Sequence, residues 1–338
     1  MKLVSYKTED IEHLGVYVNG HIYNLNSCDK QLPDQMGAFL QGGEVLMERA
    51  KKIDAQIKAR EIQPKIEVFF ELIAPVPHPS SCRDAYAFRQ HVAAARRNRK
   101  MEMIPEFDQY PVFYFTNHNA IQGPGEIECM PDHFKQLDFE LEIAAVIGKK
   151  GRNFTAAEAD DYIAGFMIMN DMSARTLQME EMRLNLGPAK GKDFSTAIGP
   201  WLVTPDELEP YKTAAKPGHT GNAYNLKMTC TVNGVEVSAG NAADMDWTFA
   251  EIIERCAYGV DVLPGDIIGS GTVGTGCFLE LNGTGLYNDE NYQPQWLQDG
   301  DEVEMEITGL GRLINIIKKS DSDLSILALK KYADLKHS

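Results

Sequence analysis

Acidic and apolar residues alternate in the short segment 137–142, whose sequence is LDFELE. If this segment is a strand, successive side chains point to opposite faces, so Asp138, Glu140 and Glu142 share one face. In one interpretation that face is simply in contact with solvent. In the other, a divalent cation neutralises the three like charges, because carboxylate oxygens are the ligands that Mg²⁺ or Ca²⁺ prefers. The segment by itself leaves both interpretations open.

A further acidic residue follows an apolar run. Residues 163–169 (IAGFMIM) predict a buried strand, and Asp171 comes shortly after it. If Asp171 opens the following helix, Arg175 and Gln178 lie on the same helical face as Asp171. An acid, a guanidinium group and an amide would then meet at one site. Ordinary helix capping combined with a surface ion pair explains the same pattern nearly as well.

A third block, residues 84–91 (DAYAFRQH), contains an acid and a histidine. If the block is helical, Asp84 and His91 lie two turns apart on one side of the helix. A lone histidine is more often structural or exposed than catalytic. The basic residues that follow, within 96–100, are equally typical of a solvated helix face.

The glycine-rich segment 269–274 (GSGTVG) matches the pattern of a dinucleotide-binding loop. That loop requires a helix directly after the glycines and an early βαβ unit. Here the next residues, 277–281, predict a strand, and the segment lies near the C-terminus. We therefore expect no dinucleotide site, and we expect the glycines to let the backbone approach a ligand closely.

The elements that must position these residues are mostly strands. Asn-Gly pairs at 19–20 and 233–234 predict hairpins, and the period-two pattern of 302–307 predicts a half-buried strand. Helices are expected over 44–60 and from Thr248, where Thr248 and Glu251 form a capping box. Because strands do not alternate regularly with long helices, the pattern favours a β-rich α+β fold over a doubly wound sheet.

A proline-rich stretch at 75–79 indicates a boundary near residue 72. We expect a small N-terminal domain over 1–72 and a larger domain over 73–338. At 338 residues, the chain is long enough for this division.

The net charge of −16 argues against a nucleic-acid partner, and an anionic substrate would need local positive charge. Because the N-terminus has no long apolar segment and no run of about 18 apolar residues occurs, the sequence predicts a cytoplasmic protein with no membrane partner. The six cysteines show no metal-binding spacing and are expected to be reduced and mostly buried.

Four blocks, taken together and in this order, resemble the fumarylacetoacetase (fumarylacetoacetate hydrolase) family. They are DAYAFRQH at 84–91, LDFELE at 137–142, MNDMSARTLQMEEMRLNLGPAKGK at 169–192 and GSGTVGTGCFLE at 269–280. The resemblance covers roughly residues 72–317. It implies a mixed β-sandwich/roll catalytic domain preceded by a small α/β domain. The first block is more similar to fumarylacetoacetase itself than to the acylpyruvase-like members.

The resemblance also implies roles for individual residues. Divalent metal ligands are expected at Asp84, Glu140, Glu142 and Asp171. A water-activating pair is expected at His91 and Glu280, with Arg175, Gln178 and Lys192 around the reacting carbonyls. Substrate contacts are expected from Tyr86, Arg89, Lys100 and Thr272.

The implied function is metal-dependent hydrolysis of a carbon–carbon bond in a small anionic β-diketo acid. Fumarylacetoacetate, an intermediate of aromatic amino-acid catabolism, is the expected substrate, Mg²⁺ or Ca²⁺ the expected cofactor without an organic one, and a homodimer the expected assembly. The alternative is a decarboxylase or isomerase of a related oxo-dicarboxylic acid. Two departures bear on the substrate: Met182 stands where the family has a substrate-binding tyrosine, and Lys100 stands where it has an arginine.

Overall fold

A computed structural model describes residues 1–331 of the chain. Its helices are mostly short, and α3 is the longest of those described. They are α1 Leu25–Cys28, α2 Met36–Gln41, α3 Gly43–Lys58, α4 Arg89–Asn98, α5 Ala156–Ala159, α6 Arg175–Met182, α7 Phe249–Ala257 and α8 Phe278–Asn288.

Two sheets form the centre of the molecule. The larger sheet has the strand order β3-β2-β1-β13-β11-β10-β18-β5-β6, with β4 beside β1 and β7 beside β13. Its strands are β1 Lys2–Thr8, β2 Ile11–Val18, β3 His21–Asn24, β4 Glu71–Leu72, β5 Cys82–Ala85, β6 Phe113–Thr116, β7 Ile121–Gln122, β10 Leu141–Ile147, β11 Ile163–Asp171, β13 Thr196–Val203 and β18 Ile267–Gly269.

The smaller sheet has the order β17-β16-β19-β20-β8, and two short ribbons pair β12 with β9 and β14 with β15. These strands are β8 Gly125–Cys129, β9 Leu137–Asp138, β12 Ser173–Ala174, β14 Lys212–Thr213, β15 Ala223–Tyr224, β16 Lys227–Val232, β17 Val235–Asn241, β19 Glu302–Ile307 and β20 Gly311–Lys319.

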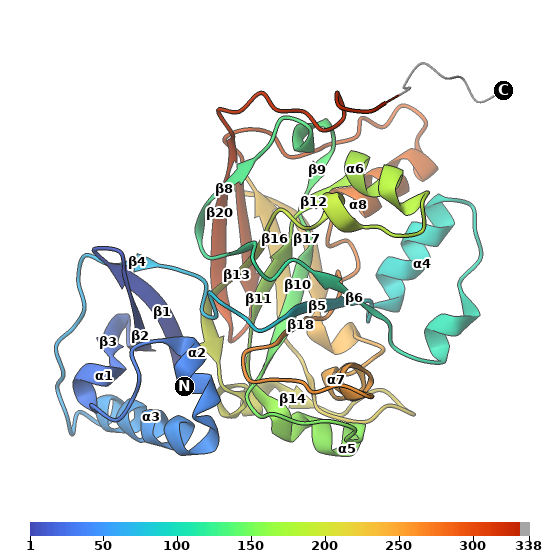
Figure 1. Cartoon of the computed structure of the whole chain (residues 1–338). Helices are drawn as coiled ribbons and strands as arrows, with labels where there is room; N and C mark the ends of the chain where they lie inside the picture. Colours follow the sequence, from blue (N-terminus) through green and yellow to red (C-terminus); the bar gives the residue numbers. More distant parts are fainter. Residues whose placement is uncertain (332–338) are drawn as a thin grey trace.

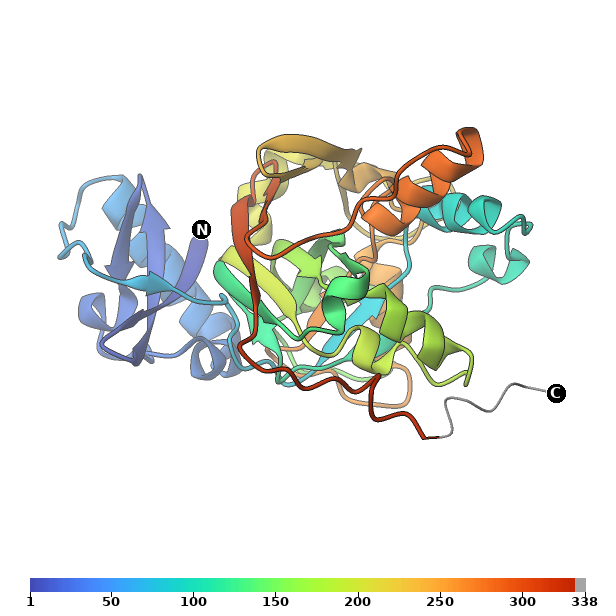
Figure 2. The same cartoon turned by 90° about the horizontal axis from the view of Figure 1, so that it is seen from above.

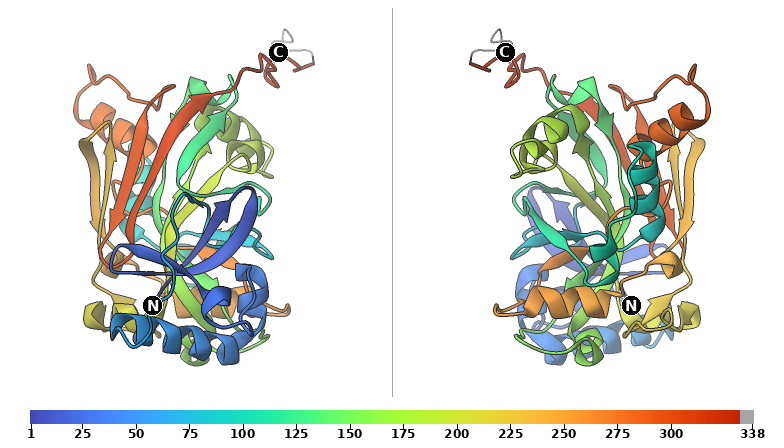
Figure 3. Two further views of the ribbon diagram at one scale, coloured as in Figure 1. Left: turned by 90° about the vertical axis from the view of Figure 1, so that its left-hand side faces the viewer. Right: turned by 90° about the vertical axis from the view of Figure 1, so that its right-hand side faces the viewer.

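The main hydrophobic core lies between the two sheets. Ile143 and Ile168 of the large sheet belong to the same buried cluster as Met228 and Met305 of the small one. Figure 3 shows the yellow and red strands of the small sheet alongside the green central strands of the large one. This packing buries one face of each sheet, which explains the alternation of apolar and acidic residues along β19.

The N-terminal residues extend the large sheet. β1 pairs antiparallel with β13, so that β1–β3 continue the sheet beyond its central strands. In Figure 1 this part, with α1–α3, lies to one side of the two-sheet body. α4 and α8 lie side by side at the opposite end (Figure 2). The division into domains near residue 72 stays a prediction.

The predictions that rest on short-range sequence patterns are confirmed. Both Asn-Gly pairs form hairpins, between β2 and β3 and between β16 and β17. α3 and β19 occupy the expected segments, and Thr248 and Glu251 form the expected capping box at the start of α7. The β-rich α+β class is confirmed. All six cysteines are free, and five of them are buried.

Three local predictions are wrong. Asp84 does not begin a helix, because it lies in β5, which is paired on both sides. Asp171 does not open a helix, because it is the last residue of β11. Residues 277–281 do not form a strand, because α8 begins at Phe278. In each case partners distant in the sequence determine the local structure.

Candidate active site and metal centre

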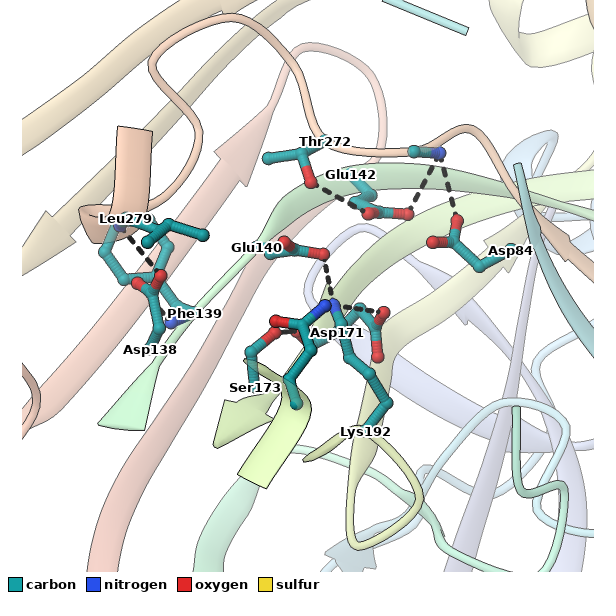
Figure 4. Close-up of polar contacts among 12 residues, drawn as sticks. Asp84, Asp138, Phe139, Glu140, Glu142, Asp171, Ser173, Lys192, Thr272 and Leu279 are labelled. Atoms are coloured by element: carbon teal, nitrogen blue, oxygen red, sulfur yellow. Dashed lines mark hydrogen bonds and ion pairs between the residues drawn. The ribbon is translucent and has the colours of Figure 1, made fainter. Parts of the chain in front are cut away.

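Four acidic residues meet at one edge of the large sheet. Because β10 runs antiparallel to β11 and β18, its first residues lie beside the last residues of those strands, and the end of β5 lies next to β18. This arrangement gathers Asp84, Glu140, Glu142 and Asp171, which are all buried. One carboxylate oxygen from each lies within 4.8 Å of the others. Figure 4 shows their side chains around a common space.

The acidic face of segment 137–142 is only partly as expected. Glu140 and Glu142 join the cluster, so the interpretation as a solvated face is wrong. The segment is not one continuous strand, because β9 ends at Asp138 and β10 begins at Leu141. Asp138 therefore turns away from the cluster and bonds to Arg175 instead.

The cluster has the properties of a cation site. Burial, together with the charge of Asp171, raises the pKa of Asp84 to about 7. Burial and the neighbouring Asp84 and Glu140 raise the pKa of Glu142 well above its usual range. Among the side chains that the structure describes, Asp171 Oδ1 is a buried oxygen without a hydrogen-bond partner. Since clustered carboxylates are stable together when a cation neutralises them, the donor set fits Mg²⁺, Mn²⁺ or Ca²⁺.

Two buried cations border the cluster. Lys192 Nζ contacts Glu140 Oε2 and lies 2.7 Å from Asp171 Oδ2. Arg175 Nη2 lies 2.7 Å from Glu140 Oε1 and 2.8 Å from Asp138 Oδ2. Burial alone would raise the pKa of Glu140, but Lys192 and Arg175 lower it to about 2. Two cationic side chains therefore lie beside the cluster, as the sequence predicted.

The Arg175 guanidinium also donates to Gln178 Oε1, at 3.0 Å. Both residues belong to α6, whose N-cap residue is Ala174. Arg175 and Gln178 thus lie in the same site as Asp171, although not through a shared helix.

His91 and Glu280 form a buried pair. His91 Nδ1 lies 2.6 Å from Glu280 Oε2, and the two residues come from α4 and α8. The other oxygen of Glu280 accepts a hydrogen bond from the backbone nitrogen of Thr275 at 3.0 Å. The imidazole is thereby held by a carboxylate that is itself fixed, which is how a histidine is oriented for proton transfer.

Asp138 connects these parts. Its carboxylate accepts hydrogen bonds from the backbone nitrogens of Phe278 at 2.7 Å and Leu279 at 2.9 Å, as well as from Arg175 Nε at 2.8 Å. The N-cap residue Cys277 makes no side-chain capping bond, so Asp138 caps α8 from a distant segment. Figure 4 shows Asp138 beside Leu279, away from the four carboxylates. This long-range cap explains why local sequence did not predict α8.

The backbone of Gly271 contacts the carboxylate cluster. Its amide donates to Asp84 Oδ1 at 3.0 Å and to Glu142 Oε2 at 3.2 Å. Its φ of +81° favours glycine, and an added Cβ would lie 2.6 Å from the carbonyl oxygen of Ala85. The backbone of the glycine-rich segment therefore comes close to the carboxylates of Asp84 and Glu142.

A cavity of about 470 Å³ opens over the cluster. Nine of the sequence-predicted site residues line it: Asp84, Tyr86, His91, Glu140, Arg175, Gln178, Lys192, Thr272 and Glu280. Glu142 and Asp171 lie in the adjoining carboxylate cluster. Met182, at the position where the family has a tyrosine, also lines the cavity.

Two predicted substrate contacts lie elsewhere. The guanidinium of Arg89 forms an ion pair with Asp108 in a separate pocket, because the side chain points to the opposite side of α4 from His91. Lys100 follows the end of α4 with a left-handed backbone and does not line the cavity. Neither side chain lines the cavity, and the two substrate contacts stay predictions.

Arg99 and Tyr114 are site residues that the sequence did not reveal. Arg99 is the C-cap residue of α4, eight positions after His91, and lines the cavity. Helical spacing from His91 would have identified it. Tyr114 donates a hydrogen bond of 2.5 Å to Asp171 Oδ2. It lies in β6, and no short-range signal predicts that β6 pairs with β5.

Known proteins are similar to this chain in sequence and in fold. The family model described as "Fumarylacetoacetate (FAA) hydrolase C-terminal" matches residues 81–318. The chain is 32% identical over 324 residues to "Oxaloacetate tautomerase Fahd2a, mitochondrial" of Rattus norvegicus, covering 93% of this chain and 91% of the relative. The similarity to "Oxaloacetate tautomerase FAHD2A, mitochondrial" of Homo sapiens is 32% over 327 residues, with the same coverage of 93% and 91%.

Solved structures show the same fold. A maleylpyruvate hydrolase from Sphingobium sp. SYK-6, in complex with manganese (II) ion and pyruvate, matches with a TM-score of 0.67. The identity is 19%, and the match covers 95% of this chain and 100% of the other. At this identity the likeness is one of fold.

The expectation of a cytoplasmic protein is contradicted. It rested on the absence of a long apolar segment at the N-terminus, but both relatives named above are described as mitochondrial. An N-terminus without such a segment is therefore no evidence for the cytoplasm. Within residues 1–331, no helix is both long enough and apolar enough to cross a membrane.

Proposed function

The chain belongs to the fumarylacetoacetate hydrolase family, and on that premise we propose that it is a divalent-metal-dependent tautomerase or isomerase of a small oxo-dicarboxylic acid. Oxaloacetate is the first substrate to test, because it is the substrate in the names of relatives that align along most of this chain. The observation that carries the proposal is the buried His91–Glu280 pair, which shares one cavity with the four-carboxylate cluster.

Tautomerisation moves protons without breaking a bond between heavy atoms. The enol oxygen loses a proton, and the carbon next to the oxygen-bearing carbon gains one as the double bond moves from carbon–carbon to carbon–oxygen. A bound divalent cation, held by Asp84, Glu140, Glu142 and Asp171, would supply Lewis-acid stabilisation of the enolate oxygen. His91 has Nδ1 engaged by Glu280, so Nε2 is the ring nitrogen free to donate or accept the substrate proton.

The remaining side chains bind and orient the anion. Arg175 and Lys192 provide positive charge beside the cluster, where the carboxylate and the reacting oxygen of a keto acid would lie. Gln178 is fixed by its hydrogen bond to Arg175 and turns its amide toward the same cavity. Met179 and Met182 make one wall apolar, which limits access of water to the enolate.

Hydrolysis of fumarylacetoacetate is the second candidate. It requires a base that activates water, and the 2.6 Å contact between His91 and Glu280 meets that requirement. The same pair serves equally for transfer of a proton to carbon, so its geometry does not separate the two reactions. The names of the aligned relatives favour tautomerisation.

Arg99 is proposed to bind the second carboxylate of the substrate. It is a cation at the cavity wall, which His91 also lines. Because the side chain is exposed, Arg99→Gln should raise KM by only about 5- to 10-fold, with kcat little changed. Steady-state kinetics on oxaloacetate would measure this. Lys100→Gln is the matched control, and an equal rise in KM for that variant would contradict the assignment.

The proposed activity is tested by following the loss of enol absorbance in fresh oxaloacetate solutions containing Mg²⁺ or Mn²⁺. The rate above the uncatalysed reaction should increase in proportion to protein and disappear with a chelator. Release of CO₂ at the same rate would instead indicate a decarboxylase.

A further inference from the structure

A second group of metal-ligating side chains lies beside the four-carboxylate cluster. A ring nitrogen of His91, a carboxylate oxygen of Glu140 and the sulfur of Cys277 lie within 4.8 Å of one another, and all three residues are buried. Cys277 has no part in the proton transfer proposed above. Its position beside both the base and a metal ligand therefore needs another explanation.

We propose that His91, Glu140 and Cys277 form a second cation site, selective for Zn²⁺, whose occupation inhibits the enzyme. The inhibition rests on the proposed function, because the cation would take the lone pair of the histidine nitrogen that exchanges protons with substrate. The binding site itself does not depend on which reaction the enzyme catalyses.

The donor atoms distinguish this site from the neighbouring one. Zn²⁺ is bound by combinations of sulfur, imidazole nitrogen and carboxylate oxygen, and three protein ligands leave a fourth position for water. Mg²⁺ and Ca²⁺ take oxygen ligands almost exclusively, as the four-carboxylate cluster offers. A thiolate ligand therefore selects against the cations expected at the cluster.

The surroundings of His91 fit a zinc ligand. Metal-binding histidines usually donate their other ring N–H to a carboxylate, which fixes the ring and increases its basicity. Here Glu280 Oε2 lies 2.6 Å from Nδ1, and Glu280 is itself held by the Thr275 amide. The second ring nitrogen is left to face a cation.

The local charge allows two divalent cations. Six buried carboxyl groups lie around two buried basic side chains, Arg175 and Lys192: Asp84, Asp138, Glu140, Glu142, Asp171 and Glu280. With all six ionised and one divalent cation at the cluster, the cavity wall still carries an excess of negative charge. Binding of zinc must release the proton of the Cys277 thiol, because the thiolate is the zinc ligand. The cavity that reaches His91 and Glu140 provides the route of entry.

The test is a zinc titration of turnover in saturating Mg²⁺. Micromolar Zn²⁺ should inhibit the wild-type enzyme. Cys277→Ser and Cys277→Ala should turn over normally without zinc, but should need at least about 10-fold more zinc for the same inhibition. Cys28→Ser is the control, because Cys28 is a more accessible thiol that does not line the cavity, and it should behave as wild type.

Cobalt provides a readout that does not depend on activity. Co²⁺ added to the Mg²⁺-loaded wild-type protein should produce thiolate-to-cobalt charge-transfer absorption, which both Cys277 variants should lack. If zinc inhibits the variants and wild type equally, or if additional Mg²⁺ fully relieves the inhibition, zinc acts at the carboxylate cluster and the proposal is wrong. If Co²⁺ produces no thiolate absorption, the second site does not exist, whatever reaction the protein catalyses.

Discussion

Replacing Glu142 by glutamine should abolish most of the metal-dependent activity, because affinity for the divalent cation should fall by at least about 100-fold. Glu142 is fully buried, and its carboxylate lies against Asp84 and the Gly271 amide. Glutamine has nearly the same shape but offers one neutral oxygen in place of an anion. The affinity can be measured by calorimetric titration with Mn²⁺ or Mg²⁺, and activity in parallel.

The same variant should show whether Glu142 binds the metal or has only a structural role. Without metal, removal of one of several crowded negative charges should raise the melting temperature of the protein. The rise in melting temperature that wild type shows on adding metal should be nearly lost in the variant. Glu236→Gln, which removes an exposed charge on β17, is the control and should keep the full metal-induced rise. A variant at Glu142 that binds metal normally would refute the assignment.

Replacing His91 by alanine should lower kcat by at least about 100-fold and leave metal affinity and KM nearly unchanged. The histidine is the group that exchanges a proton with substrate, whereas the cation is held by other side chains. Glu280→Gln should have a milder effect, because it weakens the orientation and basicity of the imidazole without removing it.

A second histidine–glutamate pair provides the control for this prediction. His219 Nδ1 lies 3.0 Å from Glu251 Oε2, in a pocket away from the carboxylate cluster. His219→Ala should therefore keep normal turnover. If His91→Ala also kept near-normal turnover, His91 would not be the acid–base group, and both the tautomerase and the hydrolase mechanisms would have to be abandoned.

The structural predictions were correct where contacts between residues close in the sequence determine the structure. The Asn-Gly hairpins and the capping box of α7 involve residues a few positions apart, and all of them form as expected. The resemblance to a family placed Glu140, Glu142 and Asp171 in one cluster, and the structure brings them together.

The predictions failed where contacts between residues far apart in the sequence determine the local structure. α8 forms because Asp138 caps it across a long stretch of sequence, and Asp84 is in a strand because β6 and β18 flank β5. Arg99 lines the cavity and Lys100, one position later, does not, because the end of α4 determines which side chain faces the cavity. The side chain of Arg89 likewise lies away from the cavity, since it pairs with Asp108 on the other side of α4.

The most direct test of the central claim compares two reactions of one metal-loaded preparation. kcat/KM would be measured for conversion of enol to keto oxaloacetate and for cleavage of fumarylacetoacetate, with His91→Ala as the background for both. We expect the tautomerase value to exceed the cleavage value by at least about 100-fold and to fall to background without His91. Efficient cleavage of fumarylacetoacetate, with enol conversion no faster than in metal-containing buffer, would contradict the account.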